Sequence, residues 1–166
     1  NLIDLPGIIM VACTDRGQPR NIKDQITNLI TQYISVPNSI ILAVIAARPD
    51  IEADPAMELV KHIDPKGERT IGILTKVDLM NPGTDISDYL NNTISIDLST
   101  KYGYYAIKNR SNEEMERLNV FEGIESERIF FNQHPSYSFL EDRDRLGIEN
   151  LGKNLNQILL DRKSVV

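Results

Sequence analysis

Short apolar segments alternate with amphipathic segments along this chain, and the alternation constrains the fold more than any other feature. Apolar segments lie at 40–45, 70–74 and 102–107, and Leu2 and Ile3 have the character of the end of a buried strand. Strands that are apolar on both faces are typical of a parallel sheet covered by helices on both sides. The pattern therefore predicts an α/β domain with a mostly parallel sheet, in which 40–45 is a central strand.

Helix signals fill the intervals between the predicted strands. They comprise apolar periodicity over 22–34, an N-cap and first-turn proline at Asp54-Pro55, a short helix behind Asp85, a capping box at Ser111–Glu114, and helical periodicity onward to Val166. The predicted elements follow one another without a linker or a repeat.

Composition excludes several classes of protein. The formal net charge is −6, which argues against an electrostatic grip on nucleic acid or acidic lipid. Cys13 is the only cysteine, so an internal disulfide is impossible and a reducing, cytoplasmic compartment is expected. The apolar run 40–47 is far shorter than the roughly 20 residues that span a bilayer. Because the sequence opens without methionine, within what resembles a strand, we expect the true N-terminus to lie elsewhere.

Four polar clusters each follow the carboxyl end of a predicted strand. In open α/β sheets ligands bind at that edge, so the four clusters are expected to converge on one site. They are Asp4–Gly7, Ala47–Asp50, Thr75–Asp78 and Asn109–Asn112.

The cluster Thr75–Asp78 carries the most specific chemistry. A carboxylate accepts both of the adjacent N–H donors of guanine, whereas adenine has an unprotonated ring nitrogen there, and Asp78 is the candidate for that carboxylate. Lys76 is expected to lay its aliphatic stem along the purine face. A solvated turn after a strand explains these four letters alone equally well.

The cluster Asp4–Gly7 has the character of a phosphate sensor. Asp4 is expected to hold Mg²⁺ through water, and Gly7 to bring its backbone N–H close to a terminal phosphate. A strand ending in a proline-glycine turn is the simpler interpretation of this cluster alone. After the last strand, Asn109 and Arg110 are expected to support base and ribose, while Ser111 mainly caps a helix.

The chain resembles the large GTPases of the dynamin superfamily, which includes the conventional dynamins and the Mx proteins. Residues 64–80 match the pattern of that family almost continuously, and the resemblance covers essentially the whole chain. The later matches are Gly83–Asp85, Gly103-Tyr104, Asn109–Ser111, Phe130-Phe131 and His134-Pro135.

The resemblance implies a Ras-like P-loop GTPase fold with GTP and Mg²⁺ as ligands. It makes 1–166 the part of a G domain from the phosphate-sensing motif onward, without the N-terminal strand and P-loop. Hydrolysis is then stimulated when two G domains meet, with Asp50 in the loop that reaches across this dimer. The implied site comprises Asp4 and Gly7 at the phosphates, Thr75, Lys76 and Asp78 at the base, and Asn109 and Arg110 in the third nucleotide loop, with Asn112 where conventional dynamins usually have glutamine.

A P-loop of the form G-x-x-x-x-G-K-[ST] is absent from the sequence, so no catalytic side chain is assigned and the chain alone is expected to bind GTP poorly and to be inactive. The expected function is GTP hydrolysis by the intact protein, in which membrane contact for membrane remodelling comes from regions outside this chain. A degenerate G domain that serves as an interaction module is the main alternative. An ATPase is disfavoured because Asp78 is suited to guanine.

Overall fold

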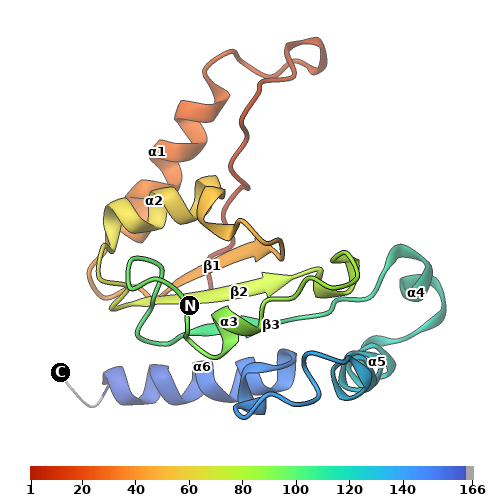
Figure 1. The fold of residues 1–166 in the computed structure, drawn as a ribbon. Helices are drawn as coiled ribbons and strands as arrows, with labels where there is room; N and C mark the ends of the chain where they lie inside the picture. The colour runs from red at the N-terminus through yellow and green to blue at the C-terminus, as the bar shows by residue number, and fades with distance from the viewer. Residues whose placement is uncertain (164–166) are drawn as a thin grey trace.

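A computed structural model describes residues 1–163, with side-chain surroundings to Asp161, and contains a three-stranded parallel sheet in the order β1-β2-β3 (Figure 1). The strands are β1 (Ile41–Ala46), β2 (Thr70–Thr75) and β3 (Tyr104–Ala106). In register, Ile41 lies beside Thr70 and Gly72 beside Tyr104. The prediction of an α/β fold with a parallel sheet is confirmed.

The predicted helices form, although the C-terminal helical segment is divided into three. The helices are α1 (Ile22–Ile34), α2 (Pro55–Ile63), α3 (Ser87–Leu90), α4 (Asn112–Arg117), α5 (Val120–Gln133) and α6 (Ile148–Lys163), and the 3₁₀ turns are η1 (Thr14–Arg16), η2 (Ile51–Ala53), η3 (Val77–Leu79) and η4 (Arg143–Arg145). The part of the last predicted helix at 164–166 lies outside the described residues. Asp54 caps α2 by accepting from the Ala56 N–H, at 2.8 Å.

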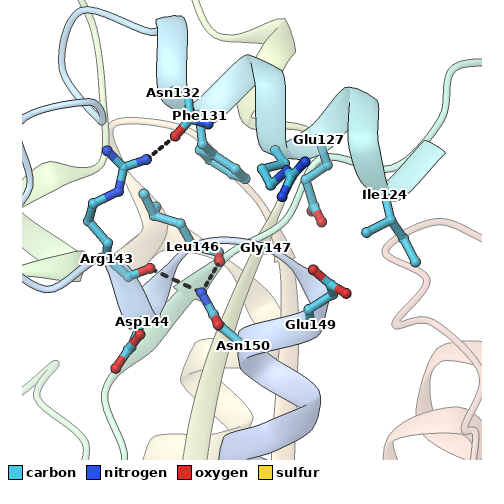
Figure 2. A pocket seen from close by; sticks show the side chains of 11 residues that line it. Ile124, Glu127, Phe131, Asn132, Arg143, Asp144, Leu146, Gly147, Glu149 and Asn150 are labelled. Atoms are coloured by element: carbon cyan, nitrogen blue, oxygen red, sulfur yellow. Dashed lines mark hydrogen bonds between the residues drawn. The ribbon is translucent and has the colours of Figure 1, made fainter. Parts of the chain in front are cut away.

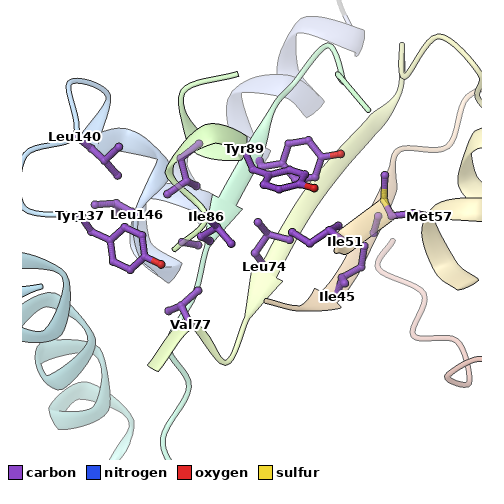
Figure 3. Packing of buried hydrophobic residues seen from close by; sticks show 14 of the residues in the cluster. Ile45, Ile51, Met57, Leu74, Val77, Ile86, Tyr89, Tyr137, Leu140 and Leu146 are labelled. Carbon is purple, nitrogen blue, oxygen red and sulfur yellow. The ribbon is translucent and has the colours of Figure 1, made fainter. Parts of the chain in front are cut away.

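Helices cover both faces of the sheet, as predicted (Figure 1). On one face, side chains of all three strands pack with those of α2, α3 and α5 in the larger core, which includes Met57, Leu74, Tyr89 and Phe131 (Figure 3). On the other face, a smaller core joins Ile71, Ile73, Tyr105 and Ile107 to Leu151 and Ile158 of α6. The sheet is therefore held between two apolar layers.

Gly72 fixes how closely β2 and β3 pack. A Cβ added to Gly72 would lie 2.1 Å from the ring of Tyr104, which is fully buried across the glycine. The hydroxyl of Tyr104 donates to the Leu98 carbonyl at 2.7 Å, so its polar end is satisfied. β2 is thus the buried central strand of the described sheet.

The prediction that 40–45 is a central strand is wrong for the described sheet, because β1 lies at its edge. Ile41 and Ala47 donate their N–H groups toward β2, to Arg69 and Thr75. Because backbone groups alternate along a parallel strand, those of Val44 face away from β2. The Val44 side chain is 58% exposed. The open edge of β1 therefore presents both apolar surface and unpaired backbone groups.

The prediction that Leu2 and Ile3 end a buried strand is also wrong, because no strand forms at the start of the described chain. Leu2 is 86% exposed, and Ile3 is exposed as well. A strand requires a neighbour to take up its backbone hydrogen bonds, and the described residues provide none here. Leu5 alone of this segment packs against the larger core.

The turn that leads into β2 is built around one buried carboxylate. Asp64 accepts from the N–H groups of Glu68 and Arg69 at 3.1 and 3.0 Å, and from the Thr70 hydroxyl at 2.6 Å. Burial by itself raises the pKa of Asp64, but these three donors hold the pKa below its ordinary value. The sequence indicated only a turn here, whereas the structure shows that the Asp64 carboxylate holds residues 68–70 at the start of β2.

Candidate functional site

Three of the four polar clusters lie together at the carboxyl edge of the sheet. The Ala47 N–H donates to the Thr75 carbonyl at 2.7 Å, and the Ile107 N–H donates to the Leu74 carbonyl at 2.8 Å. The segments that follow β1, β2 and β3 therefore begin side by side. The fourth cluster, Asp4–Gly7, follows no strand in the described chain, so its predicted place at a strand end is wrong.

The turn after β2 has an unusual backbone at Lys76. This residue has φ of 58°, in the left-handed region that non-glycine residues adopt rarely and at a cost of about 1–2 kcal/mol. Its carbonyl accepts from the Leu79 N–H at 3.0 Å, which closes the short turn η3. The Lys76 side chain is exposed. Such strain is found where a site requires a particular geometry.

Asp78 lies in the middle of this turn and is anchored on both sides. Val77 before it is buried in the larger core (Figure 3), and Met80 after it packs against the same core and accepts from the Tyr137 hydroxyl at 3.9 Å. Asp78 itself is half-buried, and its carboxylate has no hydrogen bond or ion pair with the described residues. Both carboxylate oxygens are therefore available to a ligand with paired donors.

Thr75 has a structural role that the sequence did not indicate. Its hydroxyl donates to the Ile45 carbonyl at 3.2 Å, and the residue is half-buried. This hydrogen bond joins the last residues of β1 and β2. The Thr75 side chain therefore contributes to the site by fixing the strand ends.

The loop after β3 is braced by an ionic cluster that the sequence did not predict. The Lys108 ammonium donates to both carboxylate oxygens of Glu114, at 3.0 and 3.1 Å, and lies 3.4 Å from the Ser126 hydroxyl. The Ser111 N–H also donates to Glu114, at 2.8 Å, which completes the predicted capping box and confirms the capping role of Ser111. The Ser111 N–H, followed by Lys108, lowers the pKa of Glu114 to about 2.

The Arg110 side chain turns away from the strand ends. Its guanidinium donates to the Leu118 carbonyl, between α4 and α5, and its stem lies over Gly123, where an added Cβ would be 2.6 Å from the Arg110 Cδ. The side chain is committed to holding α4 and α5, which leaves the backbone of the loop to meet a ligand. Asn109 and Asn112 are both exposed, and Asn112 is the first residue of α4.

The cluster after β1 is held together by Arg48. Its guanidinium pairs with Asp54 at 3.0 Å and more loosely with Asp50 at 3.7 Å. Asp50 remains largely exposed at the tip of the loop, so its carboxylate is accessible from outside the molecule.

The segment Asp4–Gly7 is mostly exposed and has few contacts that would fix the position of its side chains. Asp4 is exposed, and a Cβ added to Gly7 would meet nothing within 4 Å. Within residues 1–163, no group of three or more histidine, cysteine or acidic side chains is arranged to hold a metal. Asp4 is a single carboxylate. It fits Mg²⁺ in the common arrangement in which water and phosphate oxygens supply most of the ligands of the ion.

Other parts of the described surface do not supply a phosphate cradle. Residues 147–154 spell G-I-E-N-L-G-K-N, the nearest approach to a P-loop, but they begin α6, where the backbone is helical. A pocket of 260 Å³ lies between α5 and the start of α6 (Figure 2), and a hollow of 630 Å³ lies between α3 and residues 136–145. The hollow lies away from the carboxyl ends of the strands, whereas the pocket adjoins the end of β3, where the Gly147 N–H donates to the Ala106 carbonyl at 2.9 Å.

Comparison with known proteins gives concordant matches over nearly the whole chain. The Dynamin family matches residues 1–77, and the Dynamin central region matches residues 85–162. Dynamin-2 of Bos taurus is 43% identical over 159 residues, which is 95% of this chain and 18% of that protein. Dynamin of Drosophila melanogaster is 43% identical over 95% of the chain, and the dynamin-related protein dnm1 of Schizosaccharomyces pombe is 42% identical over 96%.

The chain spans about a fifth or less of the length of these relatives, since it covers 17% of the Drosophila protein and 20% of the fission-yeast protein. Among the helices within residues 1–163, none combines the length and the apolar character that crossing a bilayer requires.

Proposed function

Because this chain belongs to the dynamin superfamily, we propose that the intact protein binds GTP and hydrolyses it to GDP and phosphate, and that this chain recognises the guanine base. The residues proposed for the base are Thr75, Lys76 and Asp78, together with Asn109, the backbone of Arg110, and Asn112.

The observation that carries the proposal is the unpartnered carboxylate of Asp78. It is half-buried after the end of the central strand, between anchored Val77 and anchored Met80, on a turn that begins at strained Lys76. Guanine offers two adjacent N–H donors to such a carboxylate, and a half-buried acid gains most from charged hydrogen bonds of this kind. A base that lacks either donor leaves an acceptor unpaired, which gives strong discrimination.

For the phosphate side, we propose that Asp4 and Gly7 approach the terminal phosphate and its Mg²⁺ in the intact protein. The ion would neutralise charge on the phosphates, while Asp4 would hold it through its hydration shell. The open edge of β1, with exposed Val44, is suited to a further strand of the intact protein that carries a P-loop.

We also propose that residues 1–166 form part of one G domain. The larger core supports this, because it contains Leu74 and Val77 from the first matched range and Ile86 and Phe131 from the second. A G-domain dimer in which exposed Asp50 reaches across to the partner is part of the same proposal, as is membrane association through regions outside this chain.

The test replaces Asp78 with Asn in the full-length protein. The amide keeps one acceptor but presents a donor to a guanine N–H, so GTP affinity is expected to fall about a hundredfold, in line with the loss of a charged hydrogen bond and a new donor–donor contact. Xanthine carries a carbonyl in place of the guanine amino group, so affinity for XTP is expected to rise in this variant. Titration with GTP and XTP measures both effects.

Asp97→Asn is the matched control, because it removes the charge of an exposed aspartate that belongs to none of the four polar clusters. GTP affinity that stays at the wild-type level in Asp78→Asn would defeat the proposal and favour a G domain that serves as an interaction module.

A further inference from the structure

A single buried acid connects the loop after β3 with the start of α6. Glu127, on α5, is only 3% exposed and points into the space between these two segments (Figure 2). One carboxylate oxygen accepts from the Lys108 N–H at 2.8 Å, and the other accepts from the Ile148 N–H at 2.9 Å. Glutamate is almost never so deeply buried without a partner, and here both partners are backbone groups.

The Lys108 contact occurs where the backbone hydrogen bonds between β2 and the segment after β3 end. Among the described residues, the last backbone hydrogen bond from this segment to β2 is that of the Ile107 N–H to the Leu74 carbonyl, and the Lys108 N–H is accepted by Glu127 instead. The side chain of Lys108 is meanwhile held by Glu114. The residue that precedes Asn109 is therefore fixed at its backbone by α5 and at its ammonium group by α4.

The Ile148 contact ties the same carboxylate to the first turn of α6. A negative charge is favoured at a helix N-terminus, where N–H groups lack helical partners. The approach is close, because a Cβ added to Gly147, whose φ is +86°, would lie 3.2 Å from the second oxygen of Glu127. Desolvation raises the pKa of Glu127, while the two N–H donors and Lys108 counter that rise.

We propose that Glu127 is a positioning residue that sets the loop 108–111 against the guanine nucleotide and links this loop to the N-terminus of α6. This inference rests on the proposed function, since it assumes that the loop meets the base. It assigns Glu127 no contact with the nucleotide. If Glu127 only stabilised the fold, its loss would reduce the amount of folded protein without changing the affinity of the folded fraction.

The test is Glu127→Gln in the full-length protein, with KM and kcat for GTP, the Kd for GDP and the melting temperature measured together. Glutamine keeps the size but can accept with only one of its two terminal atoms, so one of the two N–H groups loses its acceptor. We expect KM and the GDP Kd to rise about tenfold, as is usual for loss of a charged hydrogen bond. We expect kcat to stay within about twofold and the preference for GTP over XTP to persist.

Glu125→Gln is the matched control on the same helix. Glu125 is exposed and, within the described part of the chain, pairs with Arg128 of α5 alone, at 2.6 Å, so KM and Kd should match those of the wild type. A folded Glu127→Gln protein with wild-type KM and Kd overturns the proposal. If Asp78→Asn lowers GTP affinity while Glu127→Gln does not, only the positioning role fails; if neither does, the proposed function itself fails.

Ile148→Pro tests the link to α6 separately. Proline is well tolerated at the first residue of a helix and lacks the N–H that Glu127 accepts, and the Ile148 side chain is exposed. We expect a smaller rise in KM, about threefold, together with faster hydrogen exchange at the Lys108 amide. Unchanged KM and unchanged exchange would overturn the link. If Glu127→Gln does not fold, Glu127→Asp, which is too short to reach both N–H groups, takes its place with the same expected results.

Discussion

The two ends of the proposed nucleotide site differ in how much of their geometry this chain supplies. The loop after β3 is held by Glu127, by the Lys108–Glu114 pair and by the packing of Arg110 on α5. The phosphate-side segment, 1–9, has no regular secondary structure, and of its side chains Leu5 packs against the larger core. The loop after β3 is fixed by contacts with α4 and α5, whereas the phosphate-side segment is largely exposed.

The difference indicates that the base side of the proposed site is fixed within this chain, whereas the phosphate side depends on other parts of the intact protein. The proposed base recognition requires a carboxylate at a fixed place, and the carboxyl ends of the strands provide such a place within this chain. The proposed phosphate sensing also depends on a ligand and on a strand at the open edge of β1, which the described residues do not cover. We therefore expect substitutions on the base side to alter the free energy of unfolding, and those on the phosphate side to alter it little.

The largest difference is expected between glycine-to-alanine changes in β2, the strand that leads into the base-side turn, and in the phosphate-side segment. In Gly72→Ala the new methyl group would lie 2.1 Å from the Tyr104 ring, so the sheet must shift, and a loss of about 3 kcal/mol in the free energy of unfolding is expected. Gly7→Ala places its methyl group in open space and should change the free energy by less than about 0.5 kcal/mol. Urea titration of both variants measures the pair. Equal losses would break the comparison.

A smaller difference is expected between removing Arg110 of the loop after β3 and removing Arg20, which lies before α1. Arg110→Ala removes a charged hydrogen bond to the Leu118 carbonyl and the stem that covers Gly123, so we expect a loss of about 1–2 kcal/mol. Arg20, which is exposed, is the control, and Arg20→Ala should stay within about 0.5 kcal/mol of the wild type. Thermal unfolding of both proteins supplies the values. An Arg110→Ala protein as stable as the control would show that the guanidinium contact has no energetic role.

The smallest effect is expected in how the free energy of unfolding depends on pH. The pKa of Glu114 is lowered from 4.5 to about 2 in the folded protein, so its contribution to stability is present above pH 4.5 and is lost as the pH falls toward 2. Glu114→Gln should therefore show a shallower loss of stability across this range than the wild type. Asp4→Asn removes the same charge from an exposed site and serves as the control. Identical pH profiles for wild type and Glu114→Gln would contradict the proposed brace.

The sequence predicted those parts of the fold that depend on local pattern. The strand 70–74, the helix 22–34 and the capping box at Ser111 were visible because periodicity and capping chemistry act over a few residues. The failure at Leu2 and Ile3 has a different origin, since a strand forms only when a neighbour accepts its hydrogen bonds, and local pattern does not report the neighbour.

Contacts between distant residues were the main part of the site that the sequence did not reveal. Glu127 meets Lys108 and Ile148 across separations of 19 and 21 residues, and in the sequence it is one acid among several on a helix. Nearby Phe130-Phe131 and His134-Pro135 matched the family pattern, but no spacing rule marked Glu127. The turn of Arg110 away from the strand ends was equally invisible, because the rotamer depends on the packing of α5.

The most direct test of the account is the structure of the full-length protein with GDP bound. We predict that both carboxylate oxygens of Asp78 lie within about 3 Å of the two guanine N–H nitrogens, the distance of a charged hydrogen bond. We also predict that residues 108–111 keep the conformation described above while residues 1–9 adopt a new one. A guanine bound elsewhere, or an Asp78 side chain that faces away from it, would contradict the account.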